Sequence, residues 1–185
     1  MSSLPPATAD LETLIGLFYS HVDDLGQFTQ RHFRDLPAAY RRLLAHTGHM
    51  TVTVEDRHAS AVSVEVLQVI RSEHHYSRKI LLRRTSDQRV VQFGIVRLAL
   101  APLDAATRDE ILSERVPLGR VLIQHGVMRA VQLLGLWQVT CGAELSKYFQ
   151  IPPGNVTYGR TALIYCNDEP AVELLEIVAP EDSFS

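Results

Sequence analysis

The chain has 185 residues, of which 46% are hydrophobic and 21% are charged, and this balance predicts one globular domain with one sizeable core. Its formal net charge is −3 and its arginines are scattered, so it lacks the basic face typical of nucleic-acid binding. No window holds the roughly 18 uninterrupted apolar residues of a membrane span, and the N-terminus does not resemble a secretory signal. We therefore expect a cytoplasmic protein without a nucleic-acid or membrane partner.

Neither the cysteines nor the histidines have the spacing of a metal site. Cys141 and Cys166 form no CxxC or Cys/His motif, which favours buried thiols in a reducing compartment. His46 and His49 could share one face of a helix, but Gly48 lies between them, where the helix should end. A partly exposed pair is the favoured interpretation, and no metal is expected.

The first 45 residues predict two helices. Residues 1–9 are rich in Pro and Ser and are expected to be loose. A helix follows Asp10, its expected N-cap, with apolar residues near helical spacing up to Phe18. After a polar connector, the run L-P-A-A-Y-R-R-L-L-A-H predicts a second helix with Pro37 in its first turn.

Four strand-like runs follow. Residues 50–55 (M-T-V-T-V-E) and residues 61–70 alternate apolar and polar side chains with a period of two, and residues 56–60 would connect them as a hairpin. Residues 76–100 contain two further β-rich runs joined by the polar turn 85–88. Consecutive strands with short links favour an antiparallel sheet over βαβ units.

The second half of the chain predicts short helices between further strands. A helix capped by Asp104 is followed by a Pro-Leu-Gly turn into another helix, and residues 143–149 predict a third. Residues 130–140, 156–166 and 171–178 predict strands. The expected fold is α+β, with a single antiparallel sheet of about six strands flanked by short helices. We expect one domain over residues 1–185, with 1–9 and 181–185 loose.

Arg78 opens an otherwise apolar strand, where a cation is costly to bury without an anion. It could be a surface or structurally paired arginine. Alternatively, it could be a guanidinium fork that receives the carboxylate of a ligand.

Two glutamates of the last strand, Glu173 and Glu176, are three residues apart, so alternation sends them to opposite faces of the sheet. A buried glutamate needs a partner, and Arg78 or Arg160 would serve. The pair could be structural, or the glutamate could be a general acid/base beside an anion-binding arginine.

Four motifs in order resemble the chorismate pyruvate-lyase (4-hydroxybenzoate synthase) family: Arg78–Leu82, Pro117–Arg120, Tyr158–Thr161 and Glu176–Pro180. The resemblance implies a chorismate lyase-like fold with an enclosed pocket on the sheet. It also implies a lyase that converts chorismate to 4-hydroxybenzoate and pyruvate, a precursor step for ubiquinone-type compounds. No cofactor or metal is expected, and the partner would be a small aromatic carboxylate.

The resemblance also implies the site residues. Arg78 matches an arginine that binds a carboxylate, and Glu176 matches a late glutamate, so these two are the expected catalytic residues. Glu173 is the alternative to Glu176, because counting forward from Pro170 places Glu176 one residue late. Further residues are expected to bind the substrate: Met50, Leu118, Arg160 and Arg97.

Two departures from the family pattern leave other functions open. Lys79 stands where the family has a glutamate, and Ile95 stands where the commoner enzymes have a second arginine. A lyase-like enzyme for a related enolpyruvyl or aromatic acid is therefore one alternative. The other is a non-catalytic, effector-sensing domain of the kind found in bacterial transcription regulators, although the first ~45 residues look too short and too acidic for a winged helix.

Overall fold

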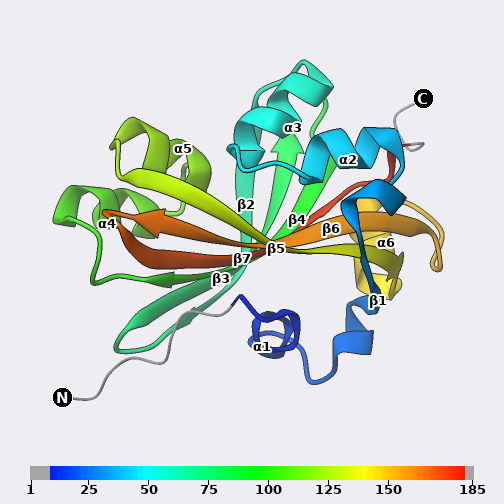
Figure 1. Cartoon of the computed structure of the whole chain (residues 1–185), viewed down its shortest axis with the longest axis horizontal. Coiled ribbons are helices and arrows are strands. Elements are labelled where there is room, and N and C mark those ends of the chain that lie inside the picture. Colours follow the sequence, from blue (N-terminus) through cyan, green and yellow to red (C-terminus); the bar gives the residue numbers. More distant parts are fainter. Residues whose placement is uncertain (1–8, 182–185) are drawn as a thin grey trace.

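The computed structural model describes residues 9–181, apart from the side chains of residues 128 and 129. It is an α+β structure built on one antiparallel sheet of seven strands in the order β1-β5-β6-β7-β4-β3-β2 (Figure 1). The strands are β1 (Gly26–Arg31), β2 (Val62–Arg71), β3 (His75–Arg84), β4 (Val90–Ala99), β5 (Met128–Cys141), β6 (Val156–Cys166) and β7 (Glu169–Val178). The predicted fold class is confirmed, with seven strands in place of about six.

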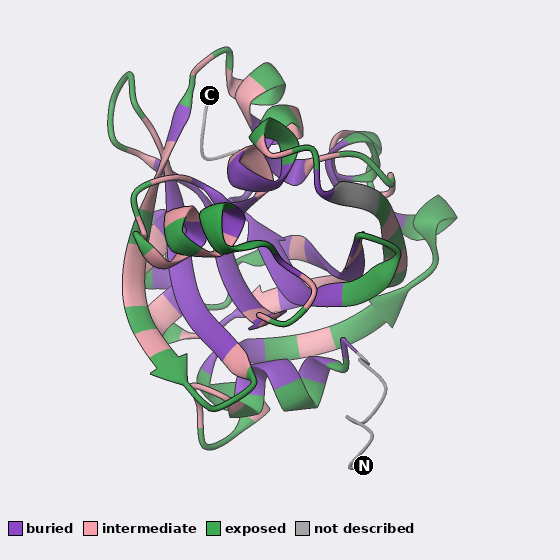
Figure 2. Ribbon diagram, turned by 90° about the vertical axis from the view of Figure 1, so that its left-hand side faces the viewer, coloured by how far each residue is buried: buried purple, intermediate pink, exposed green. Residues whose placement is uncertain are grey.

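Short helices cover both faces of the sheet. They are α1 (Leu11–Gly16), α2 (Ala38–Leu44), α3 (Met50–His58), α4 (Ala105–Leu112), α5 (Leu118–Gln124) and α6 (Ala143–Phe149), with the 3-10 helices η1 (Val22–Asp24) and η2 (Phe33–Asp35). Helices α2 to α5 pack on one face, and α1 and α6 pack on the other (Figure 1). Because the central strands are covered on both sides, they are almost wholly buried (Figure 2).

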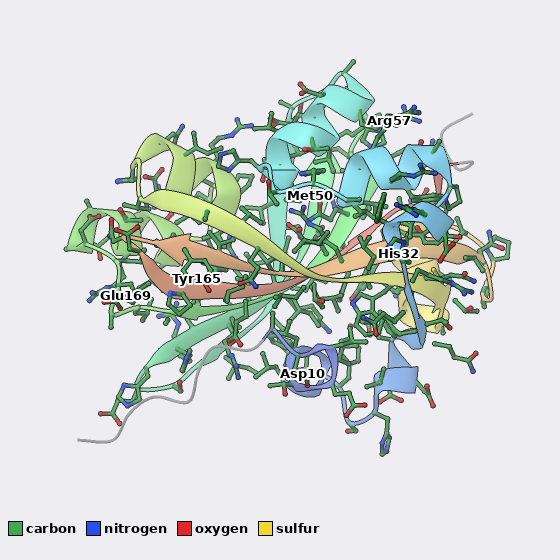
Figure 3. All side chains as sticks on the ribbon, viewed as in Figure 1. Asp10, His32, Met50, Arg57, Tyr165 and Glu169 are labelled. Carbon is green, nitrogen blue, oxygen red and sulfur yellow. The ribbon has the colours of Figure 1, made fainter. Side chains whose placement is uncertain are left out.

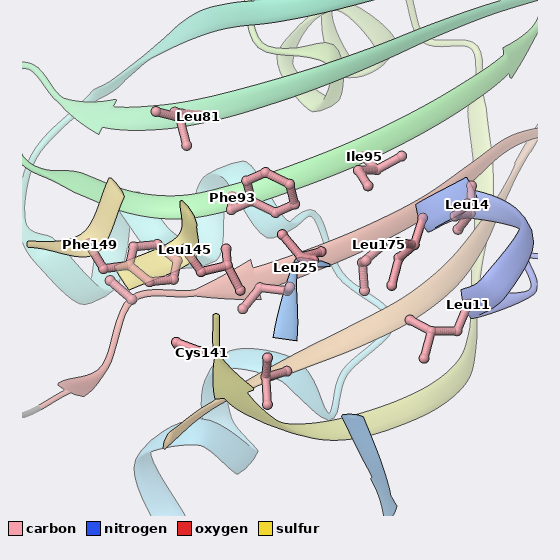
Figure 4. Packing of buried hydrophobic residues seen from close by; sticks show 14 of the residues in the cluster. Leu11, Leu14, Leu25, Leu81, Phe93, Ile95, Cys141, Leu145, Phe149 and Leu175 are labelled. Carbon is pink, nitrogen blue, oxygen red and sulfur yellow. The ribbon is translucent and has the colours of Figure 1, made fainter. Parts of the chain in front are cut away.

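The core on the α1 face follows from the alternation of side chains along the strands. Phe93 and Ile95 of β4 and Leu175 of β7 point to this face, where they meet α1 and α6. Figure 4 shows Leu11 and Leu14 of α1 turned toward these strands. Asp10 caps α1 by accepting a hydrogen bond from the backbone N–H of Thr13, as its position in the sequence predicts.

The Leu14→Ala substitution tests whether α1 is an integral part of this core. Leu14 is fully buried, so we expect the free energy of unfolding to fall by about 2–5 kcal/mol. Glu12→Ala on the exposed side of the same helix is the control and should change it by less than about 0.5 kcal/mol. Urea unfolding measures both, and equal stability of the two variants would mean that α1 does not contribute to the core.

The strand predicted at residues 50–55 is wrong, because this segment forms the first part of helix α3. The buried residues of α3 are Met50, Thr51 and Val54, which share one helical face, while Val52 is 42% exposed. The β-branched residues favour a strand locally, but packing of Met50 and Val54 against the sheet overrides that preference. The predicted hairpin at residues 56–60 is likewise wrong: the helix continues to His58, and Ala59 ends it in the left-handed conformation.

Strand β1 is absent from the predicted strands, because its polar residues are typical of a connector between the two predicted helices. Its sequence, G-Q-F-T-Q-R, is mostly exposed because β1 is an edge strand that pairs only with β5 among the described strands. The backbone comes very close at Gly26, where a Cβ would lie 2.5 Å from the carbonyl oxygen of Thr140. The partners on β5 lie 105 to 115 residues away in the sequence, so the periodicity of the segment itself does not indicate this pairing.

The predicted loose segments, residues 1–9 and 181–185, lie outside the described residues except at Ala9 and Glu181. Ala9 is buried in the α1 core. The backbone N–H of Glu181 donates to the hydroxyl of Tyr40 at 2.9 Å, and its carboxylate pairs with Arg57. These contacts hold both residues against the rest of the domain. Within residues 9–181, no helix is long and apolar enough to cross a bilayer.

Candidate functional site

A pocket lies between the sheet and the beginnings of α3 and α5. All the space between its walls, including the mouth that is open to solvent, amounts to about 590 Å³. Figure 3 labels Met50, which lies at the sheet-facing beginning of α3. Apolar side chains form most of the wall: Val64, Ile80, Leu82, Val96, Val131, Ile164 and Leu174.

Gly94 leaves the floor of the pocket open. On β4, alternation turns Gln92, Gly94 and Val96 toward the pocket, and all three line it. A Cβ at position 94 would lie 3.3 Å from the side chain of Ile80, so a larger residue would occupy the pocket. The absence of a side chain at this position therefore creates room above the central strand.

Arg78 lies in this pocket with only 1% of its surface exposed. Its Nε and Nη1 atoms are buried and have no hydrogen-bond partner among residues 9–181. Burial lowers the pKa of the guanidinium, and the hydroxyl of Tyr76 and the carboxylate of Glu114 oppose this shift. The hydroxyl of Tyr76 donates a hydrogen bond to Glu114 Oε1 at 2.9 Å, so the carboxylate of Glu114 already has a partner. Unmet donors on a buried cation are typical of a site for an anionic group.

Glu176 and Arg160 form a buried ion pair on the opposite side of β4. The Nε of Arg160 donates to Glu176 Oε2 at 2.7 Å, and its Nη1 donates to the carbonyl of His46 at 2.9 Å. The second oxygen of Glu176 lies 3.5 Å from the side-chain nitrogen of Gln92. Both carboxylate oxygens therefore have partners within the protein.

Two further pocket residues carry unpartnered polar atoms. The side-chain oxygen of Gln92 and the Nδ1 of His49 are buried, and neither has a hydrogen-bond partner in the described part of the chain. Native proteins rarely leave buried polar atoms unpaired, so their concentration here, together with Arg78, is typical of a ligand site. Sequence reasoning missed Gln92 and His49; the alternation of β4 with Gly94 could have drawn attention to Gln92.

The beginnings of α3 and α5 meet over the pocket. A Cβ at Gly119 would lie 2.9 Å from the hydroxyl of Thr51, so glycine permits this close approach. Arg120 forms an ion pair with Glu55 that ties α5 to α3. The carboxylate of Glu55 also accepts a hydrogen bond from the backbone N–H of Val62, which holds the beginning of β2 against α3.

The structure brings five of the six predicted site residues together: Met50, Arg78, Leu118, Arg160 and Glu176 all line the pocket. The sixth, Arg97, lies on the opposite face of the sheet, where its Nη2 donates to Glu173 Oε1 at 2.8 Å. Strand pairing explains this, since Arg97 and Glu173 are direct neighbours on β4 and β7. Glu173, the alternative to Glu176, is therefore not a pocket residue.

Lys79 also belongs to the opposite face of the sheet. Its ammonium group lies 3.2 Å from Glu144 Oε1 and 4.7 Å from the centre of the Tyr19 ring. The departure from the family pattern at this position therefore replaces a residue outside the pocket. Its partners hold α6 and the segment after α1 against the sheet.

The histidines predicted to be a partly exposed pair do not form a chelate. The ring of His46 uses both nitrogens locally: Nε2 lies 2.7 Å from the carbonyl of Leu43, and Nδ1 accepts from the N–H of Gly48. Burial and the nearby Arg160 lower the pKa of His46. Across the described residues, no group of three or more His, Cys, Asp or Glu side chains is placed to hold a metal.

No protein-family model matches this chain, and no curated protein matches its sequence. Solved structures match it in fold. The effector domain of PhnF from Mycobacterium smegmatis has a TM-score of 0.56 and 9% identity, over 72% of this chain and 90% of that one. The crystal structure of PhnF itself has a TM-score of 0.56 and 8% identity, over 74% and 65%.

A third match has a TM-score of 0.50 and 14% identity, over 65% of this chain and 86% of the other. It is described as the ligand-binding domain of a GntR-family transcriptional regulator from Bordetella bronchiseptica. At these identities the likeness establishes the fold alone, which is the chorismate lyase-like fold.

The prediction of a chorismate pyruvate-lyase, or of another enzyme of that type, is wrong in the light of these matches. The similar structures are described as an effector domain and as the ligand-binding domain of a regulator. The expected acid/base, Glu176, is also held by Arg160 and Gln92. The family resemblance therefore predicted the fold but not the activity.

Proposed function

We propose that this chain is a non-catalytic ligand-binding domain whose pocket holds a small organic carboxylate. The observation that carries the proposal is Arg78, a cation that lines the pocket and has two buried donors without partners among residues 9–181. A carboxylate would satisfy these donors with charge-assisted hydrogen bonds. Its binding would offset the cost of burying the guanidinium.

The remainder of the pocket favours an apolar, flat ligand body. Aliphatic side chains form the walls, and Gly94 leaves the floor free of a side chain. An aromatic ring carrying a carboxylate fits both features, since the ring is apolar and thin. The effector and ligand-binding domains that share this fold support a role in sensing such an acid rather than transforming it.

The test is calorimetric titration of the purified protein with benzoate and 4-hydroxybenzoate, together with an incubation with chorismate. We expect binding of at least one acid, with no release of pyruvate from chorismate. The matched control is Arg42→Met, which removes an exposed arginine of α2 and should leave binding unchanged. Pyruvate formation at an enzymatic rate would overturn the proposal, as would the absence of binding by both acids.

A further inference from the structure

The charged side chains that line the pocket leave one positive charge without a partner. They are Arg78, Arg160 and Glu176, which sum to +1. Arg160 and Glu176 neutralise each other at 2.7 Å, whereas Arg78 has no ion pair among the described residues. One anionic group on the ligand would therefore balance the pocket. A second would be desolvated without a counter-charge and would lie near the carboxylate of Glu176.

Gln92 presents an acceptor at the other end of the pocket. Its side-chain nitrogen is turned toward Glu176 Oε1 at 3.5 Å, which leaves its oxygen as the atom available to a ligand. That oxygen is buried and unpartnered among residues 9–181. An acceptor of this kind favours a neutral donor, such as a hydroxyl or amino group, and disfavours a second carboxylate.

Strand pairing sets the anion-binding and acceptor ends apart. Arg78 of β3 pairs with Val96 of β4, and Gln92 lies four residues before Val96 on β4. Four residues of extended chain span roughly 13 Å, so the backbones of Arg78 and Gln92 are about this far apart along the strands. Their side chains can reach toward each other from these positions. Gly94 lies midway between these two positions. A ligand that meets both groups must therefore be elongated, with its body over Gly94.

We infer that the pocket selects organic monoanions over dianions, and that Gln92 is a specificity-determining residue that accepts a hydrogen bond from a neutral donor opposite the ligand's carboxylate. The inference rests on the proposed function and narrows its ligand class. A pocket that selects monoanions would bind chorismate poorly, because chorismate carries two carboxylates.

The test uses three probes that share one ring: benzoate, 4-hydroxybenzoate and benzene-1,4-dicarboxylate. We expect 4-hydroxybenzoate to bind about threefold to tenfold more tightly than benzoate, the ratio for one neutral hydrogen bond. The dicarboxylate should bind at least about a hundredfold more weakly than 4-hydroxybenzoate, because its second charge has no partner. Calorimetric titration at constant pH and salt gives all three constants.

Gln92→Met and Gln92→Leu remove the acceptor while keeping a side chain of similar size. We expect both variants to bind benzoate as the unmodified protein does and to lose the preference for the hydroxyl. Thermal unfolding confirms that they remain folded. A hydroxyl preference retained in both folded variants would overturn the role of Gln92, and equal binding of the dicarboxylate would overturn the charge selection. If benzoate and 4-hydroxybenzoate both fail to bind to the unmodified protein, the proposed function fails, and this inference with it.

Discussion

Replacing Arg78 by methionine is expected to abolish carboxylate binding and to stabilise the protein without ligand. Truncating one partner of a buried charge pair costs about 2–5 kcal/mol of binding free energy, or roughly 30-fold to several thousand-fold in Kd. The ligand-free protein, in contrast, loses a buried cation with two unmet donors. Leaving such groups unsatisfied costs on the order of 1–3 kcal/mol, so Tm should rise by about 2–12 °C.

The loss of binding and the gain in stability together distinguish an arginine that binds a ligand from one that holds the fold together. Removing a structural arginine would destabilise the fold, whereas removing Arg78 is expected to stabilise the ligand-free protein. The experiment compares Arg78→Met with Arg42→Met by thermal unfolding, with and without 4-hydroxybenzoate. The account predicts that the ligand raises the Tm of the control variant and not that of Arg78→Met. A lower Tm for ligand-free Arg78→Met than for the control would show that Arg78 is satisfied within the protein.

Replacing Arg160 by methionine is expected to have the opposite effect on stability. It leaves the buried carboxylate of Glu176 without its cation and leaves the carbonyl of His46 without this donor. Breaking a buried ion pair in this way costs about 3–5 kcal/mol. Urea unfolding should show this loss as a lower midpoint with an unchanged slope.

The double variant Arg160→Met, Glu176→Gln is the control for this prediction. Removing the orphaned charge should recover a large part of the lost stability, since a buried neutral amide costs less than a buried carboxylate. If Arg160→Met alone were as stable as the unmodified protein, the ion pair would not hold the pocket together. If the double variant were less stable than Arg160→Met, the cost would come from something other than the unpaired charge.

The strands could be predicted where alternation and burial agree. In β3, β4, β6 and β7 the apolar residues and the turns between them were sufficient, and the alternation of β7 correctly sent Glu173 and Glu176 to opposite faces. The segment 50–55 failed because alternating Val and Thr resemble a strand in isolation. Only the sheet that Met50 and Val54 pack against makes the helix the better structure.

The site could be predicted only in part, because the sequence does not show how charges are paired across strands. Glu176 had two candidate arginines, and the strand register pairs it with Arg160. Glu173 is likewise paired with Arg97, so neither glutamate of β7 remains as an ion-pair partner for Arg78. An unpaired buried cation is a property of the assembled sheet. The sequence near Arg78 also fitted a surface arginine or one that is paired within the protein.

A crystal structure of the protein with 4-hydroxybenzoate would show directly whether Arg78 binds the carboxylate of a ligand. We expect electron density for the ligand above Gly94, with a carboxylate oxygen about 2.7–2.9 Å from a guanidinium nitrogen of Arg78. Arg160 and Glu176 should remain paired as they are in the free protein. A ligand bound elsewhere, or one in this pocket with its carboxylate away from Arg78, would contradict the account.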